Sequence, residues 1–173
     1  MIGIIDYGVG NLFSLCASLD YLNIESVVTN DIDILKKCDR IILPGVGAFG
    51  DAYKMLEKTG LIPFLKTTTK PVLGICLGMQ LLFEKSYEYG CFEGLGLIKG
   101  EVTSLKGYID DDLKIPHMGW NSLHFQNEGR LFANLPQDSY VYFVHSYYLQ
   151  AEEESIVKAT TDYSTCIHAS VEK

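Results

Sequence analysis

The stretch Pro71-Val-Leu-Gly-Ile-Cys-Leu-Gly-Met-Gln80 decides the fold of this chain. Residues 71–75 are largely apolar and predict a strand, and the residues that follow predict a helix that continues through Lys85. The central Gly74-Ile-Cys-Leu-Gly78 has the form G-x-C-x-G, which is typical of a nucleophile elbow, a tight turn between a strand and a helix. We therefore expect a sheet whose carboxyl-terminal edge carries Cys76.

Strand and helix patterns alternate on the amino-terminal side of this stretch. Strands are predicted over 1–6, 24–29 and 40–43, and helices over 12–22, 51–58 and 61–67, with Asn11 as the N-cap of the first helix. This order predicts a mostly parallel sheet with helices on both faces. The carboxyl-terminal half predicts strands over 97–105, 119–125, 140–149, 155–161 and 166–171, as antiparallel additions. No repeat or linker divides residues 1–173, so we expect one α/β domain.

Cys76 lies where a strand-to-helix turn predicts a strained backbone and a reactive side chain. Small residues are needed at Gly74 and Gly78 for so tight a turn, and the positive end of the following helix favours a thiolate. The N–H of Leu77 would face the oxyanion of a tetrahedral intermediate. Gln80 is four residues after Cys76, so its amide is expected to face the same cleft. The alternative is a buried structural cysteine at a tight turn.

A second glycine-rich segment, Pro44-Gly-Val-Gly-Ala-Phe-Gly50, follows the strand over 40–43. It contains G-x-G-x-x-G, the dinucleotide fingerprint, but the acidic residue expected about 20 residues later at the end of the next strand is missing. We interpret the segment instead as a mobile backbone strip, in which the N–H of Gly47 serves as a second oxyanion donor. A plain glycine-rich turn remains the alternative.

Histidines provide weaker signals than Cys76. His145, in Val144-His145-Ser146-Tyr147, is a candidate base, substrate contact or structural residue. His117, His124 and His168 are weaker candidates, and no acidic residue lies close enough in the sequence to orient any of the four. A catalytic triad is therefore incomplete on the sequence alone.

The composition excludes several classes of function. The formal net charge of −8 makes nucleic acid an unlikely partner. No apolar run is long enough for a membrane span, and the first residues do not resemble an export signal. The five cysteines form no C-x-x-C pair, so we expect reduced thiols in the cytoplasm and neither a metal nor a cofactor.

Five segments together resemble class I glutamine amidotransferases, which have a flavodoxin-like fold. Within that class they are most similar to the branch formed by the glutaminase subunits of imidazole glycerol phosphate synthase, from histidine biosynthesis. The resemblance runs from residue 1 to residue 173. The segments are Asp6-Tyr-Gly-Val-Gly-Asn11, Pro44-Gly-Val-Gly-Ala-Phe49, Gly74-Ile-Cys-Leu-Gly-Met-Gln80, Pro116-His-Met-Gly-Trp-Asn121 and Tyr142-Phe-Val-His-Ser-Tyr147.

The resemblance implies a role for each matched residue. Cys76 would attack the carboxamide of L-glutamine, form a thioester and release ammonia, with Gly47 and Leu77 as oxyanion donors after a peptide movement at Val46. The ammonia would pass through a tunnel to a (β/α)₈-barrel cyclase subunit, which makes imidazole glycerol phosphate and AICAR. Residues that would hold glutamine are Gln80, Ser146 and Tyr147, and residues that would face the cyclase are Asn11, Met118 and Trp120.

One part of the family pattern is not matched. The resemblance places the general-base histidine and its glutamate in a segment that follows the strand over 167–171, and residues 1–173 do not contain it. We therefore expect a carboxyl-terminally incomplete domain with little or no glutaminase activity and reduced stability, with His145 as a remote substitute for the base. The alternatives are the same glutaminase chemistry serving a sugar-amidation partner, and a catalytically silent scaffold that binds a barrel-type partner.

Overall fold

The computed structural model describes all 173 residues of the chain. Its amino-terminal half contains four strands, β1 (Ile2–Ile5), β2 (Ser26–Thr29), β3 (Arg40–Leu43) and β4 (Val72–Gly74). They form a parallel sheet in the order β2-β1-β3-β4. Ile4, Ile5 and Leu43 are fully buried in it, as expected for a parallel sheet that is covered on both faces.

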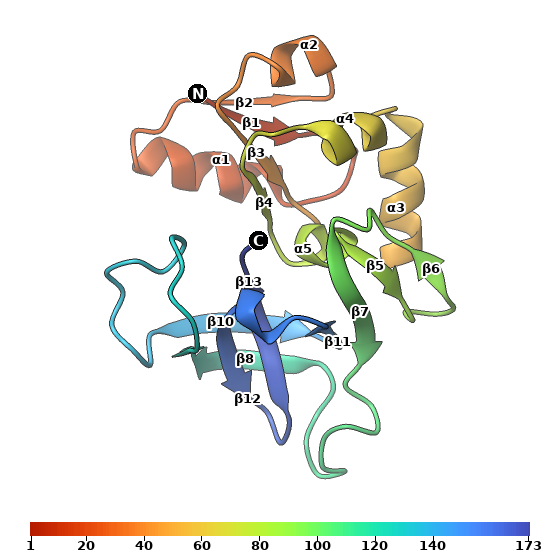
Figure 1. The fold of residues 1–173 in the computed structure, drawn as a ribbon, viewed down its shortest axis with the longest axis vertical. Helices are drawn as coiled ribbons and strands as arrows, with labels where there is room; N and C mark the ends of the chain where they lie inside the picture. The colour runs from red at the N-terminus through yellow and green to blue at the C-terminus, as the bar shows by residue number, and fades with distance from the viewer.

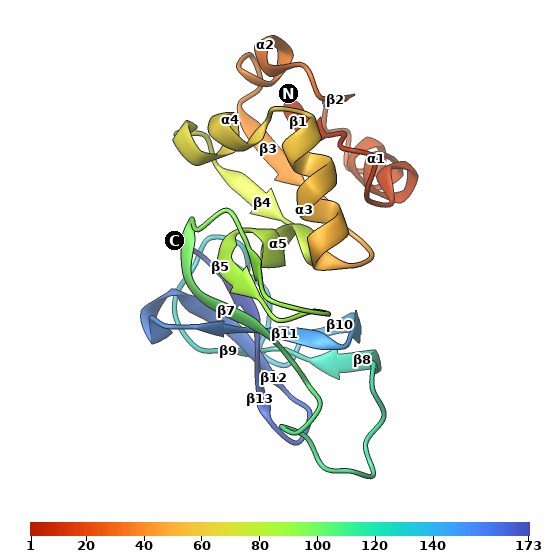
Figure 2. The ribbon, with the colours of Figure 1, turned by 90° about the vertical axis from the view of Figure 1, so that its right-hand side faces the viewer.

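Five helices accompany this sheet: α1 (Leu12–Tyr21), α2 (Ile32–Leu35), α3 (Phe49–Lys58), α4 (Ile62–Thr67) and α5 (Leu77–Leu81). Leu19 of α1 forms a small core cluster with Ile4 and Ile42, whereas α3 and α4 contribute Leu56 and Leu65 to the main core on the other side of the sheet (Figures 1 and 2). The predicted α/β class, with helices on both faces of a mostly parallel sheet, is confirmed. None of the helices combines the length and the apolarity that crossing a bilayer requires.

The carboxyl-terminal half forms two further sheets, which lie below the parallel sheet in Figure 1. The larger has seven strands in the order β6-β5-β7-β11-β13-β12-β9, and the smaller pairs β8 with β10. The antiparallel strands therefore form their own sheets and do not extend the parallel one. The bounds are β5 (Phe83–Ser86), β6 (Phe92–Glu93), β7 (Ile98–Ser104), β8 (His117–Ser122), β9 (His124–Phe125), β10 (Tyr140–His145), β11 (Tyr147–Ala151), β12 (Val157–Asp162) and β13 (Cys166–Val171), with a 3-10 helix at Glu154–Ile156.

The helix predicted through Lys85 is wrong beyond Leu81. After α5 the chain turns into the strand β5, whose first residue, Phe83, is fully buried. The carbonyls of Leu81, Leu82 and Phe83 accept hydrogen bonds from the backbone of residues 95–98, over 2.8–3.0 Å. These contacts with a distant segment replace the hydrogen bonds that would have continued the helix, so tertiary packing overrides the local pattern.

The single strand predicted over 140–149 is also wrong, because the structure divides it at Ser146. β10 pairs with β8, and β11 pairs with β7 in the larger sheet. The carbonyl of Ser146 accepts a hydrogen bond from the Leu105 N–H at 2.9 Å, which fixes the break. The break matters for the site, because it places His145 in one sheet and Tyr147 in the other.

Candidate active site

Cys76 lies between β4 and α5 with a strained backbone. Its φ of 54° and ψ of −115° lie in a region that residues with a side chain rarely adopt. Hydrogen bonds hold the turn on both sides: the Ile75 N–H donates to the Leu43 carbonyl at 3.0 Å, and the Gln80 N–H donates to the Cys76 carbonyl at 3.1 Å. The structure therefore contains the strained strand-to-helix turn that the sequence predicts at this cysteine.

The two glycines of the turn allow backbone segments to approach closely. A Cβ atom at Gly78 would lie 1.8 Å from the Leu43 carbonyl oxygen, and one at Gly74 would lie 2.6 Å from the Cα of Met79. Neither neighbour is the flexible end of a side chain, so neither can move aside cheaply. The turn thus requires glycine at both positions.

We predict that Gly78→Ala lowers the free energy of unfolding by roughly 3 kcal/mol or more, because the new methyl group would overlap the backbone of β3. Urea unfolding followed by circular dichroism measures this loss. Gly60→Ala is the matched control, since a Cβ there meets no atom within 4 Å, although φ is +72°. It should cost only about 1 kcal/mol, and equal losses for the two variants would contradict the packing argument.

The glycine-rich strip after β3 lies directly against the elbow. A Cβ at Gly45 would lie 2.6 Å from the backbone nitrogen of Gly78. The buried hydroxyl of Tyr7 donates to the Pro44 carbonyl at 2.6 Å, which anchors the start of the strip. Gly47, by contrast, has a φ of +91° and open space around it. The strip is therefore fixed at Pro44 and unobstructed at Gly47, where the sequence predicted a second oxyanion donor.

Glu88 is a site residue that the sequence analysis missed. Its carboxylate accepts a hydrogen bond from the Phe49 N–H, the first N–H of α3, at 2.6 Å. It is close enough to Cys76 and to Tyr147 to raise the pKa of both. Burial raises the pKa of Glu88 itself, and the Phe49 N–H opposes that shift. No sequence signal marked this residue, because it reaches the site from the turn after β5 and a lone glutamate there is unremarkable.

The environment of Cys76 disfavours the thiolate. Partial burial of the thiol raises the pKa of Cys76, the Leu77 N–H lowers it, and the negative charge of Glu88 raises it again. The first N–H of α5 does favour the thiolate, in the direction that the sequence predicts, but desolvation by burial has the larger effect.

We predict that Glu88→Gln lowers the pKa of Cys76, because it removes a negative charge that stabilises the thiol over the thiolate. At a pH of about 7 to 8, below the thiol pKa, iodoacetamide should then alkylate Cys76 roughly 2- to 5-fold faster. Peptide mass spectrometry would separate Cys76 from Cys91 and Cys166, which are also exposed. Glu93→Gln is the control, and an unchanged rate in Glu88→Gln would contradict the prediction.

The residues expected to hold glutamine come from a helix and from the junction of two strands. The side-chain amide of Gln80, on α5, donates to the carbonyl of Tyr147, at the start of β11, at 3.4 Å. The ring of Tyr147 makes an edge-to-face contact with Tyr89, with centroids 6.4 Å apart. Ser146 lies at the break between β10 and β11. Gln80, Tyr147 and Glu88 are thus brought together beside the elbow.

The four histidines have other partners. The two ring nitrogens of His145 lie 3.0 Å from His117 Nδ1 and 2.9 Å from the Tyr147 carbonyl. The backbone N–H of Ala151 donates to His168 at 3.1 Å. We therefore find no support for His145 as the substitute base, because neither of its nitrogens is free to take a proton from Cys76.

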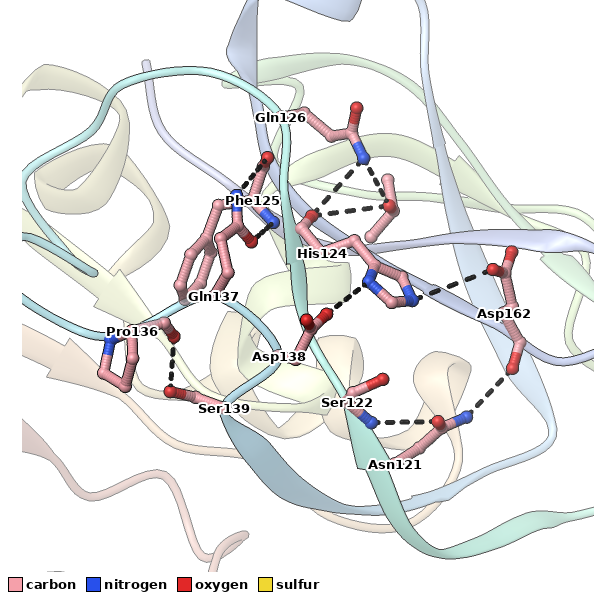
Figure 3. A network of polar contacts seen from close by, with 11 residues as sticks. Asn121, Ser122, His124, Phe125, Gln126, Pro136, Gln137, Asp138, Ser139 and Asp162 are labelled. Carbon is pink, nitrogen blue, oxygen red and sulfur yellow. Dashed lines mark hydrogen bonds and ion pairs between the residues drawn. The ribbon is translucent and has the colours of Figure 1, made fainter.

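Figure 3 shows the fourth histidine, His124, within a separate polar network. Its ring lies between two carboxylates, with Nδ1 3.0 Å from Asp138 and Nε2 3.7 Å from Asp162. Asn121 donates to the Asp162 carbonyl at 2.9 Å. These contacts join β8 and β9 to the end of β12 and to the segment before β10, so they hold the β8–β10 pair against the larger sheet.

The β8–β10 pair presents an apolar outer face. Met118 and Trp120 are 59% and 70% exposed, and Tyr142 contacts the Trp120 ring edge-to-face at 5.7 Å. Tyr142 and Val144 are directly opposite Trp120 and Met118 in the ladder, and the sequence analysis did not single them out. Asn11, the third residue expected at a partner interface, caps α1 by accepting a hydrogen bond from the Ser14 N–H at 3.1 Å. We use the word hairpin for the β8–β10 pair. Its outer face consists of Met118, Trp120, Tyr140, Tyr142 and Val144.

Comparison with known proteins gives consistent results. The family model described as glutamine amidotransferase class-I matches residues 3–173. The chain is 47% identical to the imidazole glycerol phosphate synthase subunit HisH of Bacillus licheniformis, over 99% of this chain and 82% of that protein. It is also 47% identical to the HisH subunit of Aquifex aeolicus, over 98% of this chain and 82% of that protein.

A solved structure described as a glutamine amidotransferase shares the fold, with a TM-score of 0.68 over 93% of this chain and 84% of the other, at 15% identity. The elbow at Cys76, the glycine-rich strip and the family match all point in one direction. The chain belongs to the class I glutamine amidotransferases and, within them, to the family of HisH subunits of imidazole glycerol phosphate synthase.

Proposed function

We propose that this chain is the glutaminase subunit of an imidazole glycerol phosphate synthase, which hydrolyses L-glutamine to glutamate and ammonia. The observation that carries the proposal is Cys76, held with a φ of 54° at the start of α5 and against the glycine-rich strip. A nucleophile in this position suits acyl transfer. The HisH relatives support the choice of reaction.

The first step is attack of the Cys76 thiolate on the carboxamide carbon of glutamine. The tetrahedral intermediate places its negative charge on the former carbonyl oxygen, next to the Leu77 N–H and, after a movement of the strip, the Gly47 N–H. The proton that the Cys76 thiol gives up goes to the leaving nitrogen, so collapse breaks the C–N bond, releases ammonia and leaves a thioester on Cys76. Water then hydrolyses the thioester and returns glutamate.

Glu88 and the Gln80–Tyr147 pair are placed to position the substrate. Glu88 is partly buried and takes part in none of the ion pairs of the structure, so the α-ammonium group of glutamine is a suitable ligand. Binding of that cation would also reduce the effect of Glu88 on the thiol of Cys76. Gln80, Ser146 and Tyr147 would contact the rest of the amino acid.

We do not assign a general base within residues 1–173. Each histidine ring has other partners in the structure, as described above. We therefore propose that these residues provide the nucleophile, the oxyanion donors and the substrate contacts, and that by themselves they turn glutamine over slowly. The relatives extend further than this match, since the chain spans 82% of their length.

The outer face of the hairpin is the proposed docking surface for a (β/α)₈-barrel cyclase subunit, and Asn11, at the start of α1, is proposed to face the same partner. Its exposed aromatic residues are of the kind that dominate protein interfaces. The cyclase would use the ammonia to make imidazole glycerol phosphate and AICAR. A sealed interface is useful because free ammonia is largely protonated in neutral water and is then no longer a nucleophile. A cytoplasmic location agrees with this pathway and with five unpaired cysteines.

The diazoketone analogue of L-glutamine tests the proposed nucleophile without requiring turnover. We expect it to alkylate Cys76, because it carries an electrophilic carbon at the position of the carboxamide while it keeps the amino-acid end. Intact mass and peptide mapping would locate the adduct, and excess L-glutamine should slow its formation. Cys76→Ser is expected to abolish labelling, and Cys91→Ser to leave it unchanged. Equal labelling of Cys91 and Cys76 would instead support the alternative of a silent scaffold.

For the partner surface, we predict that Trp120→Ala weakens binding of the cyclase subunit roughly 10- to 100-fold, as expected for an aromatic hot spot. Isothermal titration calorimetry measures the dissociation constant. Because Trp120 is 70% exposed, the stability of the free chain should hardly change. Tyr21→Ala removes an aromatic side chain that is 87% exposed on α1 and should leave binding intact. A similar loss in both variants would argue against this surface.

A further inference from the structure

A continuous series of side-chain hydrogen bonds runs from β8 to α5. The side-chain amide of Asn121 lies 3.4 Å from His117 Nε2, and His117 Nδ1 lies 3.0 Å from His145 Nε2. His145 Nδ1 then lies 2.9 Å from the Tyr147 carbonyl, which also accepts from Gln80 at 3.4 Å. The series thus begins beside the outer face of the hairpin and ends one helical turn after Cys76.

The Tyr147 carbonyl, at one end of the series, determines which group donates in each of the other hydrogen bonds. A backbone carbonyl can only accept, so His145 Nδ1 must carry a proton. In a neutral imidazole His145 Nε2 is then an acceptor, so His117 Nδ1 must donate to it. His117 Nε2 accepts in turn from the Asn121 amide. Both rings therefore have the Nδ1–H tautomer, and the series is complete only while both are neutral.

The surroundings favour the neutral rings. His117 is only 3% exposed and stacks between Tyr163, at 4.0 Å between ring centroids, and Phe143, at 4.8 Å. Burial and the neighbouring His145 lower the pKa of His117 to about 4. Burial also lowers the pKa of His145, against the effect of the Tyr147 carbonyl. The two rings are therefore neutral near pH 7.

The pair connects the two halves of the proposed site. His117 and His145 are directly opposite each other in the β8–β10 ladder, and each is next in sequence to a residue of the outer face, Met118 or Val144. On the other side, His145 reaches across the break at Ser146 to Tyr147, in the larger sheet. A shift of the hairpin relative to that sheet must therefore either move the Tyr147 carbonyl or break the series.

We propose that His117 and His145 are positioning residues, which couple the placement of the partner-binding hairpin to the Tyr147–Gln80 contact beside Cys76. This inference rests on the proposed function, because it assigns a role in glutamine binding and in the response to the partner. The pair has two discrete states, one with the series intact and one with it broken, as a coupling element requires. Neither ring takes a proton from the substrate.

Protonation is the simplest way to break the series. A proton added to His145 Nε2 or to His117 Nε2 turns an acceptor into a donor that faces another donor. Burial lowers the pKa of His117 from the ordinary 6.5 to about 4. The hydrogen-bond series is therefore intact above a pH of about 6.5 and is lost as the pH falls toward 4. Other titratable groups face this region. Tyr163 stacks on the His117 ring, and Glu88 and Tyr89 lie beside Tyr147. His124 lies with Asp138 and Asp162 at the end of the hairpin.

NMR of the imidazole nitrogens tests the series on the full chain, whatever its activity. We expect Nδ1–H tautomers for His117 and His145 near neutral pH. His168 is the internal control, since its Nδ1 accepts from the Ala151 N–H and must therefore be unprotonated. His117→Asn and His145→Asn assign the signals. An Nε2–H tautomer or a charged ring at either position would overturn the inference.

Labelling by the diazoketone analogue tests the coupling in the complex with the cyclase subunit. Because the pair couples the hairpin to the site, we expect binding of the cyclase subunit to increase the rate of Cys76 labelling. His117→Phe keeps the stacked ring and removes both nitrogens, so this increase should fall roughly 3- to 10-fold. His117→Asn places an amide nitrogen near the position of Nδ1 and should restore part of the increase. Tyr21→Ala removes an exposed side chain of α1 that lies outside the series and should behave like the wild type.

The two experiments separate failure of the inference from failure of the proposed function. A wild-type chain that does not react with the analogue at all would contradict the glutaminase assignment, while the tautomers would still test the link. A wild-type chain that reacts equally with and without partner would overturn the coupling, as would an unchanged partner effect in His117→Phe. Calorimetry should show unchanged partner affinity in His117→Phe, and a matching loss of affinity would reduce its role to that of an interface residue.

Discussion

The close approach of Gly78 to the carbonyl of Leu43 is the contact on which the rest of the site depends. It brings α5 onto the end of β3, so that the elbow and the glycine-rich strip share one surface. The same carbonyl accepts the Ile75 N–H, so β3, β4 and the turn at Cys76 are fixed together. The strained φ at Cys76 persists because the surrounding backbone leaves no alternative. Core packing of the parallel sheet thus supplies the rigidity that a nucleophile needs.

The electrostatics of the site suit the proposed substrate, which carries an ammonium group. In the free chain, desolvation and the carboxylate of Glu88 both act against the thiolate of Cys76. Glu88 also accepts from the first N–H of α3, which lies immediately after the glycine-rich strip. One carboxylate is therefore linked to the nucleophile, to the strip and to the place where the substrate's ammonium group would bind. Such an arrangement restrains the thiol until a cation neutralises Glu88, which limits unproductive reactions of an exposed cysteine.

The parts of the structure that depend on local sequence were the most predictable. Alternating apolar runs and the N-cap at Asn11 reflect contacts between residues close in the chain. The G-x-C-x-G turn was predictable as a motif, although its Gly78 contacts the distant Leu43. The helix predicted through Lys85 failed because residues 95–98 supply the hydrogen bonds that end it at Leu81. The strand over 140–149 failed at Ser146 for the same kind of reason, since the two parts pair with different strands. The role of Glu88 and the His117–His145 contact could not be predicted, because the partners of these residues are distant in the sequence and become neighbours only in the folded chain.

The break at Ser146 has a consequence for how the two halves of the molecule cooperate. Cys76, the proposed nucleophile, and the glycine-rich strip follow strands of the parallel sheet, whereas Tyr147 belongs to the seven-stranded sheet and the proposed partner surface to the β8–β10 pair. The proposed substrate contacts would therefore have to be aligned across more than one sheet. A buried polar series specifies such an alignment better than apolar packing, because its donors and acceptors fit in only one register. His117 and His145 satisfy each other only when the hairpin and the larger sheet are in that register, so the pair would align the proposed glutamine site with the proposed partner surface.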